Sequence, residues 1–283
     1  MEEALRDLAP RWQRYWPDAD VERIVIDVRE RMSAALDAWS LDEPEPLEGG
    51  VGSLTCAAGD VVVKVLPRHH PEEQAMRGEA EALAHWRDTG ACVPLLDQRD
   101  DGFTLLLRRL RPATSLDDVE YEEQLVEAGR LIKRLHAAGP PPESLPGVEV
   151  YTEPYRQPAD PELADLIATT ERDVAVHADL HGGNVLRDGD RWVAIDPKGV
   201  RGDPHLDIWL LLCPQAPALP HDDPVGGLRQ RIRVSCDAAG LDPERAERWV
   251  GVVARAEARL SHDSAFEWWP ERLRQIGAAL SRG

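Results

Sequence analysis

Three oxygen-bearing side chains lie close together in one stretch of this 283-residue chain. Asn184 follows Asp179 by five positions, and Asp196 follows Asn184 by twelve. Phosphoryl transfer needs such a set, because one carboxylate orients a hydroxyl and takes its proton while two further oxygen ligands hold Mg²⁺. The spacing therefore predicts a kinase active site, with Asp179 as the base and with Asn184 and Asp196 as metal ligands.

Asp and Asn are also favoured turn residues, so an ordinary loop can show the same spacing. Composition favours the functional interpretation, because Asn184 is the only asparagine in the chain. Lysine is used as sparingly: Lys64, Lys133 and Lys198 are the only three, and thirty of the 33 basic residues are arginines. We interpret Lys133 as a solvated helix residue and expect a function for Lys64.

A run of β-branched residues surrounds Lys64. Residues 61–65 read Val-Val-Val-Lys-Val between Gly-Asp and a proline, which predicts a short buried strand. A buried ammonium needs a partner, and a helix predicted over residues 72–86 places Glu79 in its apolar stripe. We predict that Glu79 pairs with Lys64 and that Lys64 binds nucleotide phosphates; a solvated helix face is the alternative for Glu79.

Two further segments are assigned to nucleotide binding. Glycines at 49–53 allow the backbone to approach phosphates closely, although a plain hairpin turn fits this segment as well. An apolar strand is expected at 103–107. In a two-lobed kinase the segment that follows it, at about 107–113, would be the hinge, whose backbone meets the adenine edge. The candidates from these segments are Gly50, Gly52, Ser53, Arg109 and Leu110.

Hydrophobic periodicity predicts the elements that position these residues. Residues 20–39 carry apolar side chains at helical spacing, so a long amphipathic helix is expected to open the fold. Further helices are expected over 121–138 and around the apolar stripe at 249–260. The strand expected at 191–195 ends on Asp196, which places the metal carboxylate at a strand end.

Composition limits the class of protein. With 42% hydrophobic residues the chain can bury a substantial core, as one large domain or as two lobes. The net charge of −19 argues against nucleic acid or an anionic membrane as partner and favours a cationic one. The chain shows no apolar run of transmembrane length, no signal-peptide pattern and no paired cysteine motif. We therefore expect a reduced, cytoplasmic protein, and a monomer.

Carboxylates and aromatic rings also gather near the C-terminus. Asp263, Glu267 and Trp268 together suit an organic cation, although the tryptophans of this segment can instead pack a helix onto the core. Asp207 is placed near the acceptor and is expected to reach back toward the catalytic loop, while capping by Asp203 is an equally physical role for an acid at this point.

The motifs resemble those of a known family. Residues 177–186 read H-A-D-L-H-G-G-N-V-L and resemble the H-G-D-L-H-x-x-N-x-L signature of the aminoglycoside phosphotransferases. Residues 194–204 are similar to the I-D-P-K-x-x-x-G-D-P form of the streptomycin 6-phosphotransferase and hydroxyurea phosphotransferase branch, and residues 105–110 to its L-L-L-E-R-L. Two departures are Ala178, where glycine is usual, and Arg108, where the branch carries an acid. We expect alanine to be a mild change unless φ must be positive.

The resemblance implies an α+β, two-lobed protein-kinase-like fold. An N-terminal lobe over residues 1–110, with a β-sheet and a helix, would precede a mainly helical C-terminal lobe over 111–283. ATP and Mg²⁺ would be the cofactors, with Asp179, Asn184, Asp196, Lys64 and Glu79 in the roles given above. Lys198 would contact the γ-phosphate or pair with Asp203, and His181 would shape the loop; both join the acceptor-side candidates.

The expected function is ATP-dependent O-phosphorylation of a small cationic antibiotic, which would inactivate it. Streptomycin-like aminoglycosides come first, followed by basic cyclic peptides of the viomycin and capreomycin type. Acidic patches at 151–173 and 263–271 are expected to line the acceptor site, and neutral hydroxyurea gains no support from charge. The alternatives are a kinase for choline or a sugar, and a non-catalytic pseudokinase binding module.

Overall fold

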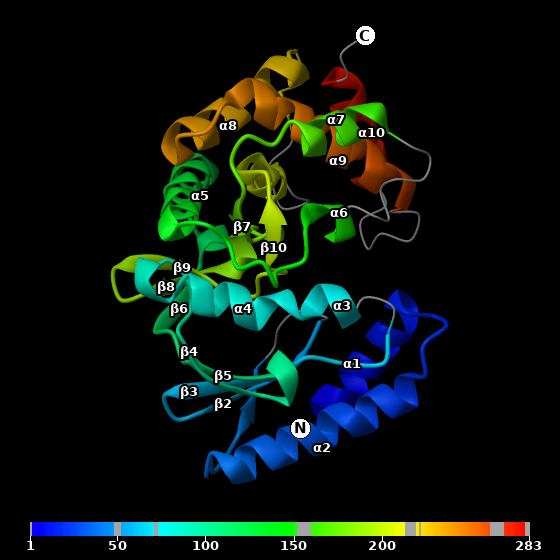
Figure 1. Ribbon diagram of the computed structural model, residues 1–283, viewed down its shortest axis with the longest axis vertical. Coiled ribbons are helices and arrows are strands. Elements are labelled where there is room, and N and C mark those ends of the chain that lie inside the picture. Colours follow the sequence, from blue (N-terminus) through cyan, green and yellow to red (C-terminus); the bar gives the residue numbers. More distant parts are fainter. Residues whose placement is uncertain are drawn as a thin grey trace.

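The computed structural model describes residues 2–47, 52–70, 73–151, 160–212, 219–220, 222–260 and 269–280. A part built on an antiparallel sheet lies below a mainly helical part (Figure 1). In chain order the elements of the first part are α1 (Glu2–Tyr15), α2 (Val21–Ala38), β1 (Glu45–Pro46), β2 (Leu54–Ala58), β3 (Val61–Val65), α3 (Glu73–Met76), α4 (Gly78–His85), β4 (Leu95–Arg99) and β5 (Thr104–Arg108).

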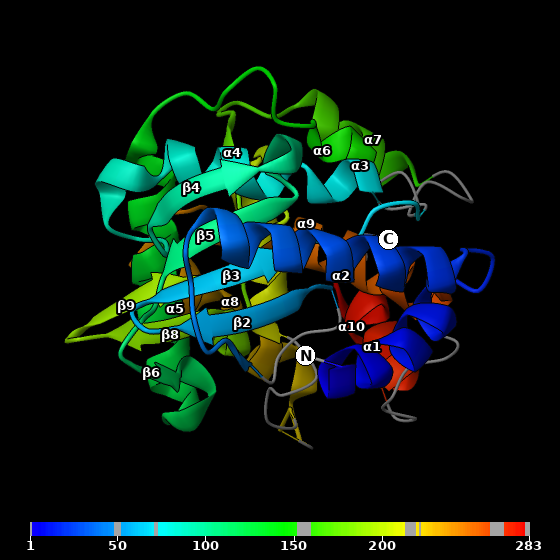
Figure 2. The ribbon, with the colours of Figure 1, turned by 90° about the horizontal axis from the view of Figure 1, so that it is seen from below.

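The sheet of the first part has the strand order β1-β2-β3-β5-β4, and every neighbouring pair is antiparallel. Side chains alternate between the two faces of a strand, so Val63 and Val65 point to one face and Lys64 to the other. Val63 and Val65 pack with α1 and α2, and Figure 2 shows α2 running across this face. Lys64 therefore faces the side on which α4 lies.

Two helices of the first part differ from the sequence expectation. The fold opens with α1, whereas the helix expected over 20–39 is α2, the second helix. Asp20 caps α2, because its carboxylate accepts a hydrogen bond from the Arg23 N–H at 3.1 Å. The single helix expected over 72–86 is interrupted at Arg77, which separates α3 from α4.

The second part is mainly helical and carries two small sheets. β7 pairs with β10, and β6, β8 and β9 form a three-stranded sheet. Short 3₁₀ helices at Gly182–Asn184 and Pro204–Leu212 follow β7 and β10. The other elements are β6 (Pro112–Ser115), α5 (Tyr121–Leu135), α6 (Val148–Tyr151), α7 (Pro161–Ala168), β7 (Val174–Val176), β8 (Val185–Asp188), β9 (Arg191–Ala194), β10 (Val200–Gly202), α8 (Pro224–Ala239), α9 (Pro243–Leu260) and α10 (Trp269–Ala279).

The larger buried cluster extends across both parts of the molecule. It joins Leu83 of α4 and Leu105 of β5 to Leu131 of α5 and Trp249 of α9. Because the core is continuous here, α4 and the β8–β9 hairpin are held in a fixed relation to one another. None of the helices in the described part of the chain combines the length and apolar character that a membrane crossing requires.

Candidate active site

Asp179 lies in the loop between β7 and β8, and a buried aspartate holds this loop in place. Asp207 accepts hydrogen bonds from the Ala178 N–H at 2.9 Å, the His177 N–H at 3.3 Å and the His136 Nε2–H at 2.9 Å. Its side chain is 0% exposed, so no acceptor molecule can touch it. Asp207 therefore braces the catalytic loop as expected, and its placement among the acceptor-binding residues is wrong.

His177 links Asp179 to the end of β9, next to Asp196. Its Nδ1 accepts a hydrogen bond from the Asp179 N–H at 3.2 Å, and its Nε2–H donates to the Ile195 carbonyl at 2.9 Å. Burial lowers the pKa of His177, which favours the neutral ring, and these two hydrogen bonds select its tautomer. His177 was assigned no role from the sequence, although it occupies the first position of the motif.

The two proposed metal ligands lie side by side on the β8–β9 hairpin. The Ile195 N–H donates to the Asn184 carbonyl at 2.9 Å, which places Asn184 next to Asp196. The Asn184 amide nitrogen donates to the Asp179 carbonyl at 2.8 Å, and this leaves its side-chain oxygen for a metal ion. A carboxylate and an amide oxygen suit Mg²⁺, so the residues fit the ion that the sequence implied.

Lys64 makes the predicted ion pair and a second one. Its Nζ lies 2.7 Å from both carboxylate oxygens of Glu79 and 2.5 Å from Oδ1 of Asp196. Burial alone would lower the pKa of Lys64, but the Asp196 and Glu79 carboxylates raise it above its ordinary value. Burial raises the pKa of Glu79 to about 7, with the Lys64 ammonium opposing that rise. The ammonium thus joins Glu79 of α4 to Asp196, which follows β9.

Lys198 approaches the base instead of Asp203. Its Nζ lies 3.5 Å from Oδ2 of Asp179. Asp203 is occupied by Arg245 at 2.5 Å and by His205, whose N–H it accepts at 3.0 Å, so the alternative pairing of Lys198 with Asp203 is wrong. Burial alone would raise the pKa of Asp196, but the Lys64 and Lys198 ammonium groups hold it below its usual range.

Two sets of contacts hold the loop that carries Asp179. One set lies within the loop, and the other comes from the segment after the hinge. His181 Nδ1 accepts a hydrogen bond from the Gly183 N–H at 3.1 Å, in agreement with the expected shaping role. A Cβ on Gly182 would come within 2.0 Å of the Asp117 carboxylate, and Ser115 Oγ donates to the Gly182 carbonyl at 3.0 Å. Asp117 and Ser115 were not predicted, because their contact with the loop spans more than sixty residues.

Of the two hinge candidates in the described part of the chain, Leu110 keeps a free backbone N–H and Arg109 does not. The Arg109 N–H donates to the Asp60 carbonyl at 2.8 Å, so it is not free to meet an adenine edge. Among the described residues the Leu110 N–H has no hydrogen-bond partner, which leaves it available. Arg108, the departure from the branch pattern, forms a two-point ion pair with Asp188 of β8, at 3.1 and 2.5 Å.

The glycine-rich segment is described only in part. Gly50 lies outside the described residues, whereas Gly52 and Ser53 immediately precede β2. Ser53 Oγ lies 3.2 Å from Oγ1 of Thr55, and a Cβ on Gly52 would meet nothing nearer than a Met76 carbon at 4.0 Å. The fold therefore does not require glycine at position 52, and phosphate binding there stays a prediction.

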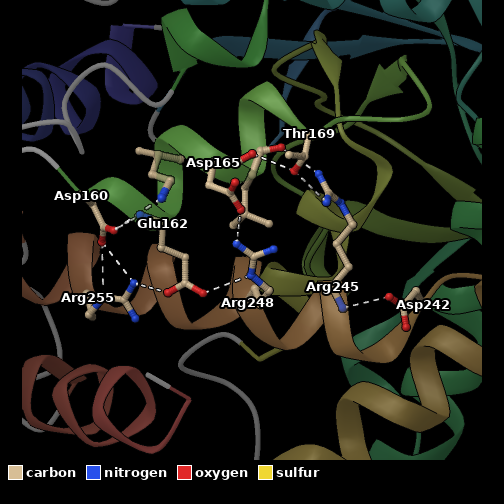
Figure 3. A network of polar contacts seen from close by, with 10 residues as sticks. Asp160, Glu162, Asp165, Thr169, Asp242, Arg245, Arg248 and Arg255 are labelled. Atoms are coloured by element: carbon tan, nitrogen blue, oxygen red, sulfur yellow. Dashed lines mark hydrogen bonds and ion pairs between the residues drawn. The ribbon is translucent and has the colours of Figure 1, made fainter. Parts of the chain in front are cut away.

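Arginines of α9 neutralise the described acidic residues of α7 (Figure 3). Arg255 lies 3.1 Å from Asp160 and 2.9 Å from Glu162, and Arg248 lies 3.2 Å from Glu162 and 2.6 Å from Asp165. These ion pairs pack α7 on α9, and the expectation that residues 151–173 line the acceptor site stays a prediction. The other acceptor candidates, Asp263, Glu267 and Trp268, lie outside the described residues.

Ala178 has a left-handed backbone, with φ of 59°, where the family motif has glycine. This positive φ is the stated condition under which the departure is not mild, since a Cβ in this conformation costs about 1 to 2 kcal/mol. We expect Ala178→Gly to raise the free energy of unfolding by about 1 kcal/mol in urea denaturation. Ala175→Gly, in the neighbouring strand, is the control and should lower it. A loss of stability in Ala178→Gly would contradict the strained conformation.

Two glycines bring α4 against the loop after the metal ligand. A Cβ on Gly78 would come within 1.9 Å of the Gly199 carbonyl oxygen, and a Cβ on Gly199 within 2.2 Å of the Gly78 carbonyl oxygen. Any side chain at either position would push α4 away. Since Glu79 follows Gly78, this contact sets the distance between Glu79 and the metal-binding strand.

Gly199→Ala tests the contact, and Gly189→Ala is its matched control. Both glycines have φ of 62°, but a Cβ on Gly189 would meet nothing within 4 Å. We expect Gly199→Ala to lower the free energy of unfolding by about 2 kcal/mol more than Gly189→Ala, because it overpacks a backbone contact. Nucleotide affinity, measured by calorimetry, should fall only in Gly199→Ala. Equal effects of the two substitutions would show that backbone conformation alone matters.

Sequence comparison finds relatives over most of the chain. A family model described as aminoglycoside/hydroxyurea antibiotic resistance kinase matches residues 51–263. A streptomycin 3″-kinase of Klebsiella pneumoniae is 32% identical, with 70% of this chain and 79% of the relative covered. A streptomycin 6-kinase of Streptomyces glaucescens is 30% identical, covering 76% of each. A hydroxyurea phosphotransferase of Kitasatospora aureofaciens is 30% identical, covering 77% and 68%.

Solved structures share the fold at low sequence identity. The streptomycin–ATP ternary complex of APH(2″)-IIa matches with a TM-score of 0.56 and 15% identity, covering 89% of this chain and 97% of the other. The choline kinase LicA of Streptococcus pneumoniae matches with a TM-score of 0.60 and 14% identity, covering 89% and 98%. These matches confirm the predicted protein-kinase-like fold with its antiparallel sheet and mainly helical second part.

Proposed function

The chain belongs to the aminoglycoside/hydroxyurea antibiotic resistance kinase family, and on this premise we propose that it transfers the γ-phosphoryl group of ATP to a hydroxyl of a small cationic antibiotic. The observation that carries the proposal is the convergence of Asp179, Asn184, Asp196 and Lys64 at one point between the two parts of the molecule. Each has the chemical type that its step needs, and none is replaced by an inert residue.

In this proposal Asp179 is the base. Its side chain keeps 27% of its surface exposed, while its backbone is fixed by hydrogen bonds to His177 and Asn184. The carboxylate orients the acceptor hydroxyl and takes its proton as the oxygen bonds to the γ-phosphorus. The bond from that phosphorus to the bridging oxygen of ADP breaks, so the products are a phosphate ester and ADP.

Lys64, Asn184 and Asp196 form the nucleotide side of the site. Lys64, held by Glu79, faces the phosphates, and the Leu110 N–H is the donor for the adenine edge. Asn184 and Asp196 would hold Mg²⁺, which when bound neutralises phosphate charge. These residues therefore orient the triphosphate toward Asp179 and keep the reacting oxygen and phosphorus close.

A cationic acceptor follows from charge and from the relatives. The net charge of −19 attracts a polycation over long range at low salt. Two of the relatives are named as streptomycin kinases, so a streptomycin-like aminoglycoside is the first acceptor that we propose. Basic cyclic peptides such as capreomycin and viomycin carry the same kind of charge and come second.

The test is ADP release by the purified protein with Mg²⁺ and ATP against a panel of acceptors. The panel contains streptomycin, other aminoglycosides, capreomycin, viomycin, hydroxyurea, choline and a sugar, and mass spectrometry follows each product. A cationic antibiotic that gains one phosphoryl group supports the proposal and names the substrate. Turnover confined to choline or a sugar would replace it with a metabolite kinase, and turnover of hydroxyurea alone would remove the cationic requirement.

A further inference from the structure

The backbone of Lys198 is fixed on two sides. Its N–H donates to the His177 carbonyl at 2.9 Å, which ties it to the strand that leads to the base. On the other side, a Cβ on Gly78 would come within 2.6 Å of the Lys198 carbonyl oxygen, so α4 packs directly on this peptide. The Lys198 side chain therefore starts from a point that cannot shift without moving α4 or the catalytic strand.

The two lysines of the site differ in how fully their donors are used. An ammonium carries three N–H donors. Those of Lys64 point to the carboxylate oxygens of Glu79 and Asp196, which lie 2.5 to 2.7 Å from its Nζ. Among the residues that the structure describes, Lys198 has one ion pair, to Asp179 at 3.5 Å, which is longer than a normal hydrogen bond. Its side chain is 34% exposed. Lys198 thus holds unused donors beside Asp179.

We propose that Lys198 is a second phosphate-binding lysine, which contacts the γ-phosphoryl group between Asp179 and Asp196 during transfer. This inference rests on the proposed function. As the acceptor oxygen bonds to the γ-phosphorus and the bridging oxygen departs with ADP, charge is spread over the peripheral oxygens of the phosphoryl group. Asp179 takes the acceptor proton, while Lys198 keeps all of its protons and neutralises those oxygens.

A brace for Asp179 is the competing role for Lys198, and nucleotide binding separates the two. A lysine that contacts the γ-phosphoryl group distinguishes a triphosphate from ADP, whereas a brace does not. We expect Lys198→Met to weaken the Mg²⁺ complex of a non-hydrolysable β,γ-imido ATP analogue about tenfold, with ADP affinity within about twofold of wild type. Lys198→Arg should bind the ATP analogue more tightly than Lys198→Met does, because arginine keeps the positive charge.

Isothermal titration calorimetry with both nucleotides makes the test, with Lys133→Met as the control. Lys133 lies exposed on α5, so its loss should leave both affinities unchanged. If Lys198→Met weakens the binding of both nucleotides by the same factor, or weakens the binding of neither, the assignment is overturned. The assignment is also overturned if Lys198→Arg is no better than Lys198→Met while both remain folded by circular dichroism. If the wild-type protein binds neither nucleotide, the proposed function fails as well.

Discussion

Asp179→Asn is expected to lower kcat for phosphoryl transfer by about three orders of magnitude. Asparagine keeps the size of the side chain, but its amide cannot take the proton of the acceptor hydroxyl. The loop should stay in place, because Asp207 and His177 hold it through backbone groups. Nucleotide affinity should change little, since Lys64 is held by Glu79 and Asp196 and not by Asp179. Steady-state kinetics and calorimetry on the same preparation measure both quantities.

The control for this substitution is Asp190→Asn, in the exposed turn between β8 and β9. It removes an equal charge from a neighbouring exposed turn without touching the site, so kcat should remain close to the wild-type value. If Asp179→Asn keeps more than about a tenth of wild-type kcat, the base has been assigned to the wrong residue.

Lys64→Met is expected to damage both the nucleotide site and the fold. The Lys64 side chain is 6% exposed, and its removal takes away the ammonium that bridges the Glu79 and Asp196 carboxylates. We expect the free energy of unfolding to fall by about 3 kcal/mol, because the buried Glu79 carboxyl group loses its partner. The kcat/KM for ATP should fall by at least about a hundredfold, since the phosphates lose their lysine.

A double substitution separates charge from packing. The double variant Lys64→Met with Glu79→Gln removes one charge of each sign. We expect it to have a higher free energy of unfolding than Lys64→Met alone and to be equally inactive. Urea denaturation gives the stabilities, and Lys133→Met serves as the solvated control. If the double variant is less stable than both single variants, the carboxylates are not the source of the destabilisation.

The spacing of Asp179, Asn184 and Asp196 could be interpreted from the sequence because the residues belong to one loop and one hairpin. The pairing of Lys64 with Glu79 was also predictable, since the two occupy adjacent elements with different periodicities, a strand and a helix. Local pattern carries this information because neighbouring elements along a chain tend to be neighbours in space.

Contacts between distant segments were not predictable in the same way. The arginines of α9 pair with acids more than eighty residues earlier, so carboxylates that look unpaired in the sequence have partners in the fold. Asp207 lies about thirty residues beyond the backbone that it braces. No periodicity reports such pairs, and Ala178 gives no sign in the sequence that its φ is positive.

The opening helix was missed for a local reason. Leu5, Leu8 and Trp12 follow helical spacing and are buried, but Pro10 lies between them and interrupts the pattern. The segment still forms α1, because Leu5 and Trp12 pack against α2 and the sheet. Tertiary packing overrides local propensity here, which sequence periodicity alone does not report.

The central claim is that the γ-phosphoryl group of ATP moves to a hydroxyl of a cationic drug. The most direct test incubates the protein with γ-³²P-labelled ATP, Mg²⁺ and streptomycin or capreomycin, and separates the labelled products. We expect the label to appear in the drug, and Asp179→Asn to abolish its transfer. Label found only in inorganic phosphate, or left in ATP with every cationic drug tested, would contradict this claim.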